Sequence, residues 1–338
     1  MSQPSNLPAV PATIGQLANA AAASAAFSLY QQEISQRTID NQRQSLALFE
    51  RYLASKGLAS VGLADGGAWW GQITHGLVKA FRQWMLKEGY SLGSVNVRLG
   101  HVRTYARVAF EAGLIGDDEH GRISLVKGIQ SAARHNVDEK REIKRIGSKK
   151  AEFNTVDLTL IERLLDSRSP TPRGRRDALI LSLGMYIGLR VGEMVILKAE
   201  DINLTENRIH VWRPKIKQHH LYTMEPRLRA CAMAVMGDYP SGVLLHRNRH
   251  TGHGKRHDDL DAQPMTRQGV FNVVQQAGVE VGIRNLSPHD LRHTGATIVS
   301  KQRDMIALID WGGWSNANTA LGYLERNKVR NENVRMSK

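Results

Sequence analysis

The feature that most constrains this chain is a set of chemically active residues divided among three short blocks of its C-terminal half. The first block is a Gly-Leu-Arg-Val-Gly-Glu stretch centred on Arg190, and the second is His289-Asp-Leu-Arg292. The third block runs from Gly-Gly-Trp314 to Tyr323. If these residues serve one site, the fold has to bring together segments that lie far apart in the sequence.

These residue types fit chemistry at the phosphorus of a DNA phosphodiester. Attack on phosphorus builds negative charge on the non-bridging oxygens, and a planar arginine side chain, always charged, can donate two parallel hydrogen bonds to them. Arg190 and Arg292 could therefore clamp one phosphate. His289 lies three residues before Arg292, on the same face of a helix, and a neutral imidazole can accept or return a proton. Tyr323 would be the nucleophile, which gives a covalent phosphotyrosine intermediate.

At these positions the chain resembles the tyrosine recombinases of the phage integrase family. The resemblance is carried by GLRVGEMVILKAEDINL, SPHDLRHTGAT and WGGWSNANTALGYLER, which follow the family's order and, with the hairpin between them, span residues 184–326. It implies that Arg190, His289 and Arg292 are catalytic and that Tyr323 is the nucleophile. It also implies that Glu193, one helical turn after Arg190, orients the site.

The third block departs from the commonest family pattern at Trp314. Many members have a second histidine at this position, in a Leu-Gly-His context. Cre recombinase, a member of the family, is similar to this chain in having Gly-Gly-Trp there, with its tyrosine the same distance downstream. Because the indole N–H of Trp314 can still donate one hydrogen bond, we interpret Trp314 as a functional replacement for the histidine.

A further catalytic residue is expected on a hairpin between the first two blocks. Residues 208–224, RIHVWRPKIKQHHLYTM, alternate as a strand, a turn and a second strand do, with Ile209 and Val211 on one face. The resemblance implies a lysine at the turn, acting as the general acid that protonates the leaving 5' oxygen. Lys215 fits best and Lys217 is the alternative, because the choice depends on a hairpin register that a sequence does not fix.

Each of these residues has an ordinary explanation when it is taken alone. A single arginine or lysine is usually a solvated surface charge, and a tyrosine at helical spacing from Trp314 and Leu321 is usually a packing residue. The conjunction of five residue types in a fixed order makes a chance match improbable, while a motif match remains a hypothesis until geometry supports it.

Composition agrees with a DNA partner. The chain has 338 residues and 46 Lys and Arg against 32 Asp and Glu, a formal charge of +14 that suggests a polyanionic partner such as nucleic acid. The single Cys231 excludes an intramolecular disulfide and, with no Cys/His cluster, argues against a structural zinc site. We expect no cofactor and no metal. Four histidines stand among basic residues and glycines, where we predict a mobile basic loop near DNA: His246, His250, His253 and His257.

The length suggests about two domains. We predict a disordered tail over residues 1–32, which have no charged side chain and three prolines. Residues 33–133 show helical spacing, with Thr74 and Ser91 or Ser94 as helix starts. On pattern alone this region could be a plain helical bundle with a solvated face, and the family resemblance implies a helical core-binding domain. A basic linker follows at 134–153, and residues 154–338 form the catalytic domain with its C-terminal tail. The predicted fold is mainly α with a small β-sheet, in which a helical domain precedes a mixed α+β catalytic domain.

Neither a secretory signal nor a membrane span can be recognised, so we expect a cytoplasmic, nucleoid-associated protein encoded by a bacterium, phage or plasmid. The resemblance implies a site-specific recombinase that acts on double-stranded DNA with inverted half-sites, as a dimer per site and a homotetramer on paired sites. One alternative is an enzyme like a type IB topoisomerase, which nicks and reseals one duplex. The other is a catalytically inactive, site-specific DNA-binding accessory protein.

Overall fold

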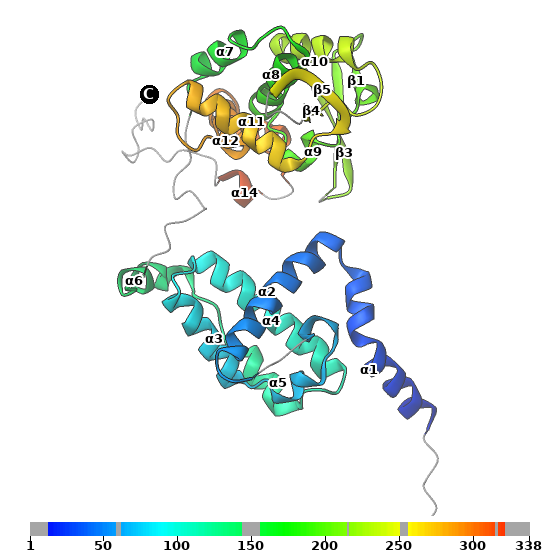
Figure 1. Cartoon of the computed structure of the whole chain (residues 1–338), viewed down its shortest axis with the longest axis vertical. Helices are drawn as coiled ribbons and strands as arrows, with labels where there is room; N and C mark the ends of the chain where they lie inside the picture. Colours follow the sequence, from blue (N-terminus) through cyan, green and yellow to red (C-terminus); the bar gives the residue numbers. More distant parts are fainter. Residues whose placement is uncertain are drawn as a thin grey trace, which may run out of the picture. The chain divides into compact units, whose positions relative to one another are not determined.

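The structure is a computed structural model that describes residues 13–58, 62–143, 156–214, 216–250, 256–314 and 317–321. It divides into two compact units, Met1–Lys149 and Lys150–Lys338, which are described separately (Figure 1). Both units are rich in helix and the second also contains small antiparallel sheets, so the predicted fold class is confirmed.

The N-terminal unit is helical throughout its described residues. Its three central helices begin at hydroxyl caps: Ser35 for α2, Thr74 for α3 and Ser91 for α4 each accept a hydrogen bond from a backbone N–H of the first turn. The sequence predicts the cap at Thr74 and offers Ser91 as one of two candidates for α4. The elements are α1 (Ile14–Glu33), α2 (Gln36–Ala54), η1 (Leu63–Asp65), η2 (Ala68–Gln72), α3 (His75–Lys87), α4 (Leu92–Glu111), α5 (Asp117–Ser124), η3 (Ser131–Ala133) and α6 (Arg134–Glu139).

The core of this unit combines aliphatic side chains with a group of aromatic rings. The ring centroids of Phe49 and Phe81 lie 4.9 Å apart, and those of Tyr52 and Phe81 lie 5.5 Å apart. Trp70 is fully buried, and its indole N–H donates to the carbonyl of Leu63 at 2.8 Å. Such rings contribute large apolar areas to the core, so the unit has a hydrophobic core of its own.

The prediction of a disordered tail is wrong for its later part, because residues 14–33 form helix α1. A capping box starts the helix: Thr13 accepts from the backbone N–H of Gln16, whose side chain accepts from the backbone N–H of Thr13. Residues 18–26 of this segment are mostly alanine, the residue with the highest helix propensity. Phe27 is buried against the core near Tyr105, so packing fixes the helix to the unit.

The predicted linker, residues 134–153, begins within a helix. Its first six residues form α6, and Arg141 donates to the backbone carbonyl of Tyr90 at 2.7 Å. Residues 144–155 lie outside the described part of the chain. The described start of this segment is therefore attached to the N-terminal unit.

The C-terminal unit mixes helices with short strands. Its elements are α7 (Leu158–Asp166), α8 (Pro172–Tyr186), α9 (Val191–Met194), η4 (Ala199–Asp201), β1 (Ile202–Asn203), β2 (Arg208–Arg213), β3 (Gln218–Thr223), α10 (Pro226–Asp238), β4 (His246–His250), β5 (Arg256–Pro264), α11 (Arg267–Glu280), α12 (Pro288–Gln302), α13 (Met305–Gly312) and α14 (Ala317–Leu321). Helix α8 is buried along most of its length, with α7, α10, α11 and α12 packed around it.

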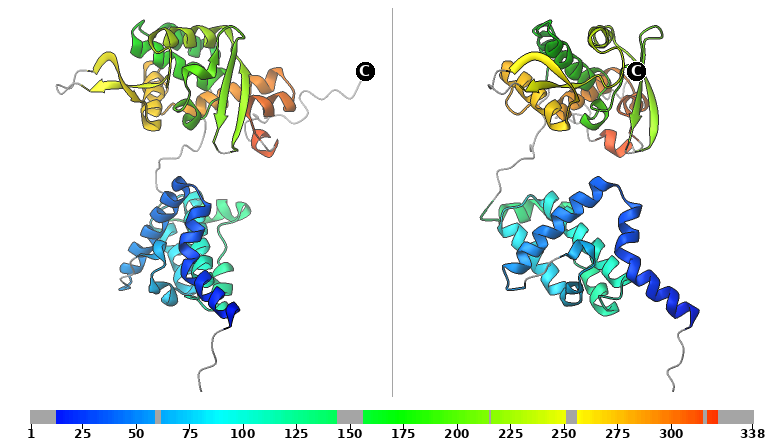
Figure 2. Two further views of the ribbon diagram at one scale, coloured as in Figure 1. Left: turned by 90° about the vertical axis from the view of Figure 1, so that its right-hand side faces the viewer. Right: turned by 45° about the vertical axis from the view of Figure 1, so that its right-hand side comes forward.

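The hairpin that the sequence predicts is confirmed. Strands β1, β2 and β3 form an antiparallel sheet in this order, and Arg213 pairs with Gln218 at the end of the β2–β3 hairpin. Ile209 and Val211 are both buried, on the face that the alternation indicates. In both views of Figure 2, α14 lies beside the turn end of this hairpin. The turn and the third sequence block therefore approach one side of the unit.

The prediction of a mobile loop around the four clustered histidines is wrong for its described residues. These residues form β4 and β5, an antiparallel pair that projects from the helical part of the unit (Figure 2). Arg176 anchors the pair, since its guanidinium donates to the carbonyl of His246 at 2.8 Å and to the side chain of Asn248 at 2.7 Å. Residues 251–255 lie outside the described residues.

Candidate active site

Arg190 stands at the start of α9, where it is tied to Glu193. The Arg190 backbone N–H donates to Glu193 Oε2 at 2.9 Å, and its Nη1 donates to Oε1 of the same carboxylate at 2.9 Å. The Glu193 side chain is buried, 4% exposed, whereas that of Arg190 is 39% exposed. The carboxylate therefore holds an arginine that still reaches solvent, which suits a cation that meets a phosphate.

Arg292 lies in the second turn of α12 and is buried at 1% exposure. Its Nη2 donates to the carbonyl of Gly312 at 2.6 Å, and its Nη1 donates to the carbonyl of Gly188. The guanidinium carbon lies 4.7 Å from the ring centroid of Trp314. Two backbone carbonyls and an aromatic face thus hold this arginine in one orientation, in the cation–π geometry.

His289 is in the first turn of α12, a helix capped by Ser287 and Asp290 in a capping box. The imidazole is exposed, yet partial desolvation and the positive charge of Arg292 lower its pKa, and Arg190 adds a smaller lowering. The nearby Asp290 acts in the opposite direction. His289 is therefore neutral near pH 7, the form that can accept a proton, and both arginines lie close enough to act on it.

Trp314 follows a Gly-Gly turn at the end of α13. Gly313 has φ +55°, and a Cβ added there would lie 2.4 Å from the guanidinium carbon of Arg213. A Cβ added at Gly312 would lie 2.0 Å from the Trp314 ring. Glycine is required at both positions, because a larger residue would displace either the arginine or the indole.

The structure adds a residue that the sequence reasoning missed. Arg213 ends β2 and is 1% exposed; its Nη1 lies 3.6 Å from Glu193 Oε1 and donates to the carbonyl of Gly312 at 2.9 Å. The signal was available, because Arg213 continues the alternation of Ile209 and Val211 and so falls on the buried face. A charged side chain on the buried face of a strand is unusual, so the pattern identifies Arg213 as a candidate functional residue.

Five of the predicted site residues lie within the described chain, and the structure brings them together through these contacts: Arg190, Glu193, His289, Arg292 and Trp314. Lys215 and Tyr323 lie outside the described residues. Lys217, the alternative general acid, is exposed at the turn with φ +52°, directly before β3. The lysine choice therefore stays a prediction, as does the role of Tyr323.

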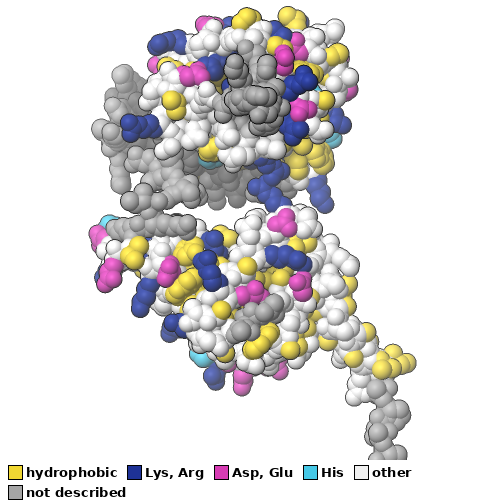
Figure 3. Space-filling model, in the orientation of Figure 1, with side chains coloured by type: hydrophobic (Ala, Val, Ile, Leu, Met, Phe, Trp, Pro, Cys, Tyr) yellow, Lys and Arg dark blue, Asp and Glu magenta, His cyan; other side chains and the backbone are white. Residues whose placement is uncertain are grey.

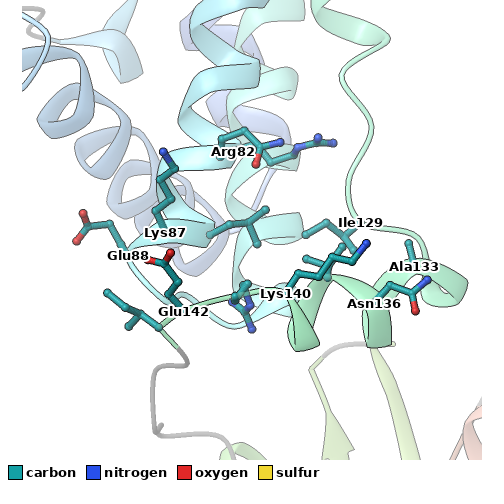
Figure 4. A pocket seen from close by; sticks show the side chains of 13 residues that line it. Arg82, Lys87, Glu88, Ile129, Ala133, Asn136, Lys140 and Glu142 are labelled. Atoms are coloured by element: carbon teal, nitrogen blue, oxygen red, sulfur yellow. The ribbon is translucent and has the colours of Figure 1, made fainter.

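A separate pocket of about 770 Å³ lies in the N-terminal unit, beside α3 and α6 (Figure 4). Its wall contains Leu86, Ile129 and Val137, and its charged residues carry both signs, among them Lys140 and Glu142. None of the predicted site residues lines it. The basic residues of its lining outnumber the acidic ones, but the lining holds no histidine or tyrosine that could act as a base or a nucleophile, so it is a poor candidate for phosphoryl-transfer chemistry.

The described ranges of the chain hold no group of three or more His, Cys, Asp or Glu residues placed to bind a metal ion. No helix in them is long and apolar enough to cross a membrane. Lys and Arg side chains appear on the visible face of both units (Figure 3), in keeping with the positive formal charge.

Solved structures with a similar fold include recombination proteins bound to DNA. A lambda integrase dimer bound to a COC' core site matches with a TM-score of 0.61 and 15% identity, over 93% of this chain and 80% of that chain. The Tn1549 transposon integrase in complex with transposon right end DNA matches with a TM-score of 0.60 and 12% identity, over 91% of this chain and 96% of that chain. At these identities the likeness shows the fold.

Sequence comparison reaches the same group of proteins. Tyrosine recombinase XerC of Roseiflexus castenholzii is 25% identical over 303 residues, which cover 88% of this chain and 85% of the relative. The model of the phage integrase family matches residues 155–330, more than half of the chain and all three sequence blocks. The chain therefore belongs to the phage integrase family, and its enzymatic class is that of the tyrosine-type site-specific recombinases.

Proposed function

We propose that this recombinase cuts and rejoins DNA through a 3'-phosphotyrosine formed on Tyr323. One observation supports the proposal most strongly: Arg190 comes from the first block and His289 and Arg292 come from the second, yet both arginines lie close enough to that histidine to lower its pKa. Two cations beside a neutral imidazole make a site for a phosphate whose charge grows during reaction. Tyr323 follows α14 closely in the sequence, and α14 lies beside the β2–β3 turn (Figure 2).

In the cleavage step, the phenol oxygen of Tyr323 bonds to phosphorus while the bond from phosphorus to the 5' oxygen breaks. His289 accepts the phenol proton, and Arg190 and Arg292 stabilise the charge on the non-bridging oxygens. Arg292 is 1% exposed, so part of its cover moves aside when the phosphate binds. Trp314 supports the phosphate and keeps Arg292 oriented through its ring.

Lys215 protonates the leaving 5' oxygen, with Lys217 as the alternative donor. The protein is then joined to the DNA 3' end, and a free 5'-hydroxyl remains. Because the phosphotyrosine keeps the energy of the broken bond, the 5'-hydroxyl of a partner duplex can reverse the step without ATP. Exchange of strands through a four-way junction follows.

Double-stranded DNA is the partner of this site, a proposal supported by the lambda integrase structure on a COC' core site and by the Tn1549 integrase structure with transposon right end DNA. We further propose that two protomers bind inverted half-sites and that two such dimers assemble as a tetramer on paired sites. Its place of action would be the cytoplasm, on the nucleoid, because the substrate is chromosomal, phage or plasmid DNA.

The test uses a target duplex selected by binding from a random library, with a nick placed next to the cleavage position so that the cut strand cannot be resealed. Wild type and Tyr323→Phe are incubated with it in EDTA, and covalent protein–DNA adducts are resolved on denaturing gels. We expect an adduct from the wild type, none from Tyr323→Phe, and similar DNA binding by both proteins. Binding without an adduct from either protein would contradict the proposal and favour a DNA-binding accessory protein. Relaxation of supercoiled DNA without a paired site would favour a topoisomerase.

A further inference from the structure

Arg213 carries a positive charge in a place where the sheet otherwise buries apolar side chains. It follows Ile209 and Val211 on the inward face of β2, and all three are at most 1% exposed. Removing a charge from water costs several kcal/mol unless partners compensate for the lost hydration. A buried arginine at the end of a strand therefore calls for an explanation in terms of its partners.

Those partners connect all three sequence blocks. Glu193, from the first block, lies 3.6 Å from Arg213 Nη1 and also accepts from Arg190. The carbonyl of Gly312, from the third block, accepts from Arg213 at 2.9 Å and from Arg292, in the second block, at 2.6 Å. The Arg213 guanidinium thus contacts two groups that hold the other arginines. The Glu193 carboxylate also holds Arg190, and the Gly312 carbonyl also holds Arg292.

The Gly-Gly turn is shaped around the same guanidinium. Gly313 places its backbone where a Cβ would lie 2.4 Å from the guanidinium carbon of Arg213, and the carbonyl of Gly313 lies 3.4 Å from Nη1. This turn sets the position of Trp314, whose ring faces Arg292. The second terminal nitrogen of Arg213, Nη2, donates to the hydroxyl of Tyr222 on the neighbouring strand β3. Both ends of the guanidinium are engaged within the protein.

We propose that Arg213 is a positioning residue for strand cleavage, which orients Arg190 through Glu193 and orients Arg292 and Trp314 through Gly312, and which does not itself bind the phosphate. The inference rests on the proposed function. Its burial distinguishes Arg213 from Arg190, whose side chain is 39% exposed. Arg292 is as buried as Arg213, so the DNA affinity of an Arg213 variant decides whether Arg213 also binds the phosphate. Displacement of reacting groups by about 1 Å is enough to slow a reaction on the order of 10²-fold, so removal of this anchor acts on rate.

The test compares Arg213→Met with Arg208→Met, the same substitution at the exposed start of the same strand. Adduct formation is followed in a single turnover with the nicked target at saturating DNA, and DNA affinity is measured separately. Arg213→Met is expected to lower the rate at saturation on the order of 10²-fold. The DNA affinity of Arg213→Met should stay within about twofold of the wild type, and so should the cleavage rate and the DNA affinity of Arg208→Met.

Equal rates for Arg213→Met and the wild type would overturn the inference. A loss that disappears at saturating DNA would also overturn it, because Arg213 would then be a DNA ligand. If Arg213→Met does not fold, Tyr222→Phe takes its place: it removes one acceptor of Arg213 while keeping the cation buried. It should lower the rate by about tenfold, the equivalent of one net hydrogen bond, without weakening DNA binding. A normal rate in this variant would count against the inference.

A second readout separates this inference from the proposed function. If the wild type forms no adduct, the proposed function fails, and the inference is decided in the DNA-free protein by the NMR resonance of the Trp314 indole N–H. That resonance should shift in Arg213→Met, or in Tyr222→Phe, and stay in place in Arg208→Met. An unmoved resonance in the first two variants would show that Arg213 does not position Trp314.

Discussion

The two units of this chain differ most in what they bury. In the described part of the N-terminal unit, the buried polar side chains are the uncharged Gln42 and Ser45, and the core is otherwise apolar and aromatic. The C-terminal unit buries charges as well: Arg176, Asp177, Glu193, Arg213, Asp290 and Arg292. Burying a charge lowers the stability of a fold unless the charge is paired. The N-terminal unit is therefore organised mainly for packing, whereas the buried charges of the C-terminal unit require a structural or functional explanation.

Burial of charge alone does not identify the active site. Arg176 is as buried as Arg292, but its partners are Asp177 and the β4 strand, so it serves to attach the β4–β5 pair. Arg213 and Arg292 differ from it because they share the carbonyl of Gly312. What distinguishes the site is that its buried charges join segments from different blocks.

A core substitution in the N-terminal unit tests whether the stability of this unit depends on packing alone. Phe49 is fully buried among aromatic rings, so Phe49→Ala should lower the free energy of unfolding of this unit by about 3–5 kcal/mol. Phe271 in α11 is 38% exposed, and Phe271→Ala should change stability by at most about 0.5 kcal/mol. Chemical denaturation followed by tryptophan fluorescence measures both. If Phe49→Ala lowered the free energy of unfolding of the C-terminal unit as well as that of the N-terminal unit, the separation of the two cores would be contradicted.

The next effect compares two arginines that face tryptophan rings, one in each unit. Arg292 lies 4.7 Å from the Trp314 ring and Arg51 lies 6.0 Å from the Trp84 ring. Arg292→Lys keeps the charge but loses the fork that reaches two carbonyls, so the single-turnover cleavage rate should fall about 10²- to 10³-fold. Arg51→Lys, at an exposed position, should stay within about twofold. Similar losses in the two variants would mean that the buried charge has no special role.

The smallest effect concerns one histidine in each unit. Desolvation and a neighbouring arginine lower the pKa of His289, through Arg292, and that of His101, through Arg98. In the DNA-free protein, NMR titration should therefore give midpoints below the ordinary value of ~6.5 for both. Because the folded-state pKa is lowered, the neutral forms stabilise the fold above ~6.5, and this contribution is lost as the pH falls through the folded pKa.

DNA should distinguish the two histidines. A phosphate bound between Arg190 and Arg292 places negative charge near His289 and raises its midpoint, whereas His101, which is hydrogen-bonded to Ser45, should move less. A midpoint for free His289 at or above ~6.5, or equal shifts of both histidines on DNA binding, would contradict the arrangement of charges described above.

The sequence predicted the parts of the fold that depend on local signals. Hydroxyl caps mark the starts of α3 and α4, and alternation marks the β2–β3 hairpin. Helix α1 was mistaken for disorder, because its few buried side chains, such as Phe27, are recognisable only once their tertiary contacts are known. The loop expected near residue 250 is wrong in its described residues for a similar reason, since irregular pairing with register shifts hides the pattern of β4 and β5.

The candidate site also contains residues that the sequence identifies and one that it does not. Arg190, Glu193, His289, Arg292 and Trp314 stand in blocks that a motif identifies, and the structure brings them together while their roles remain proposals. Arg213 stands in no block, and its role depends on a carbonyl a hundred residues further along the chain. Such a long-range contact could not be derived from spacing, although the alternation of β2 pointed to a buried charge.

The most direct test of the account locates the covalent bond itself. The wild-type adduct is trapped on the nicked target, the DNA is trimmed by nuclease, and the protein is digested with trypsin and examined by mass spectrometry. We expect a nucleotide attached through its 3' phosphate to the peptide 304–326, on Tyr323, the single tyrosine of that peptide. Attachment to another residue, or through the 5' end of the cut strand, would contradict it.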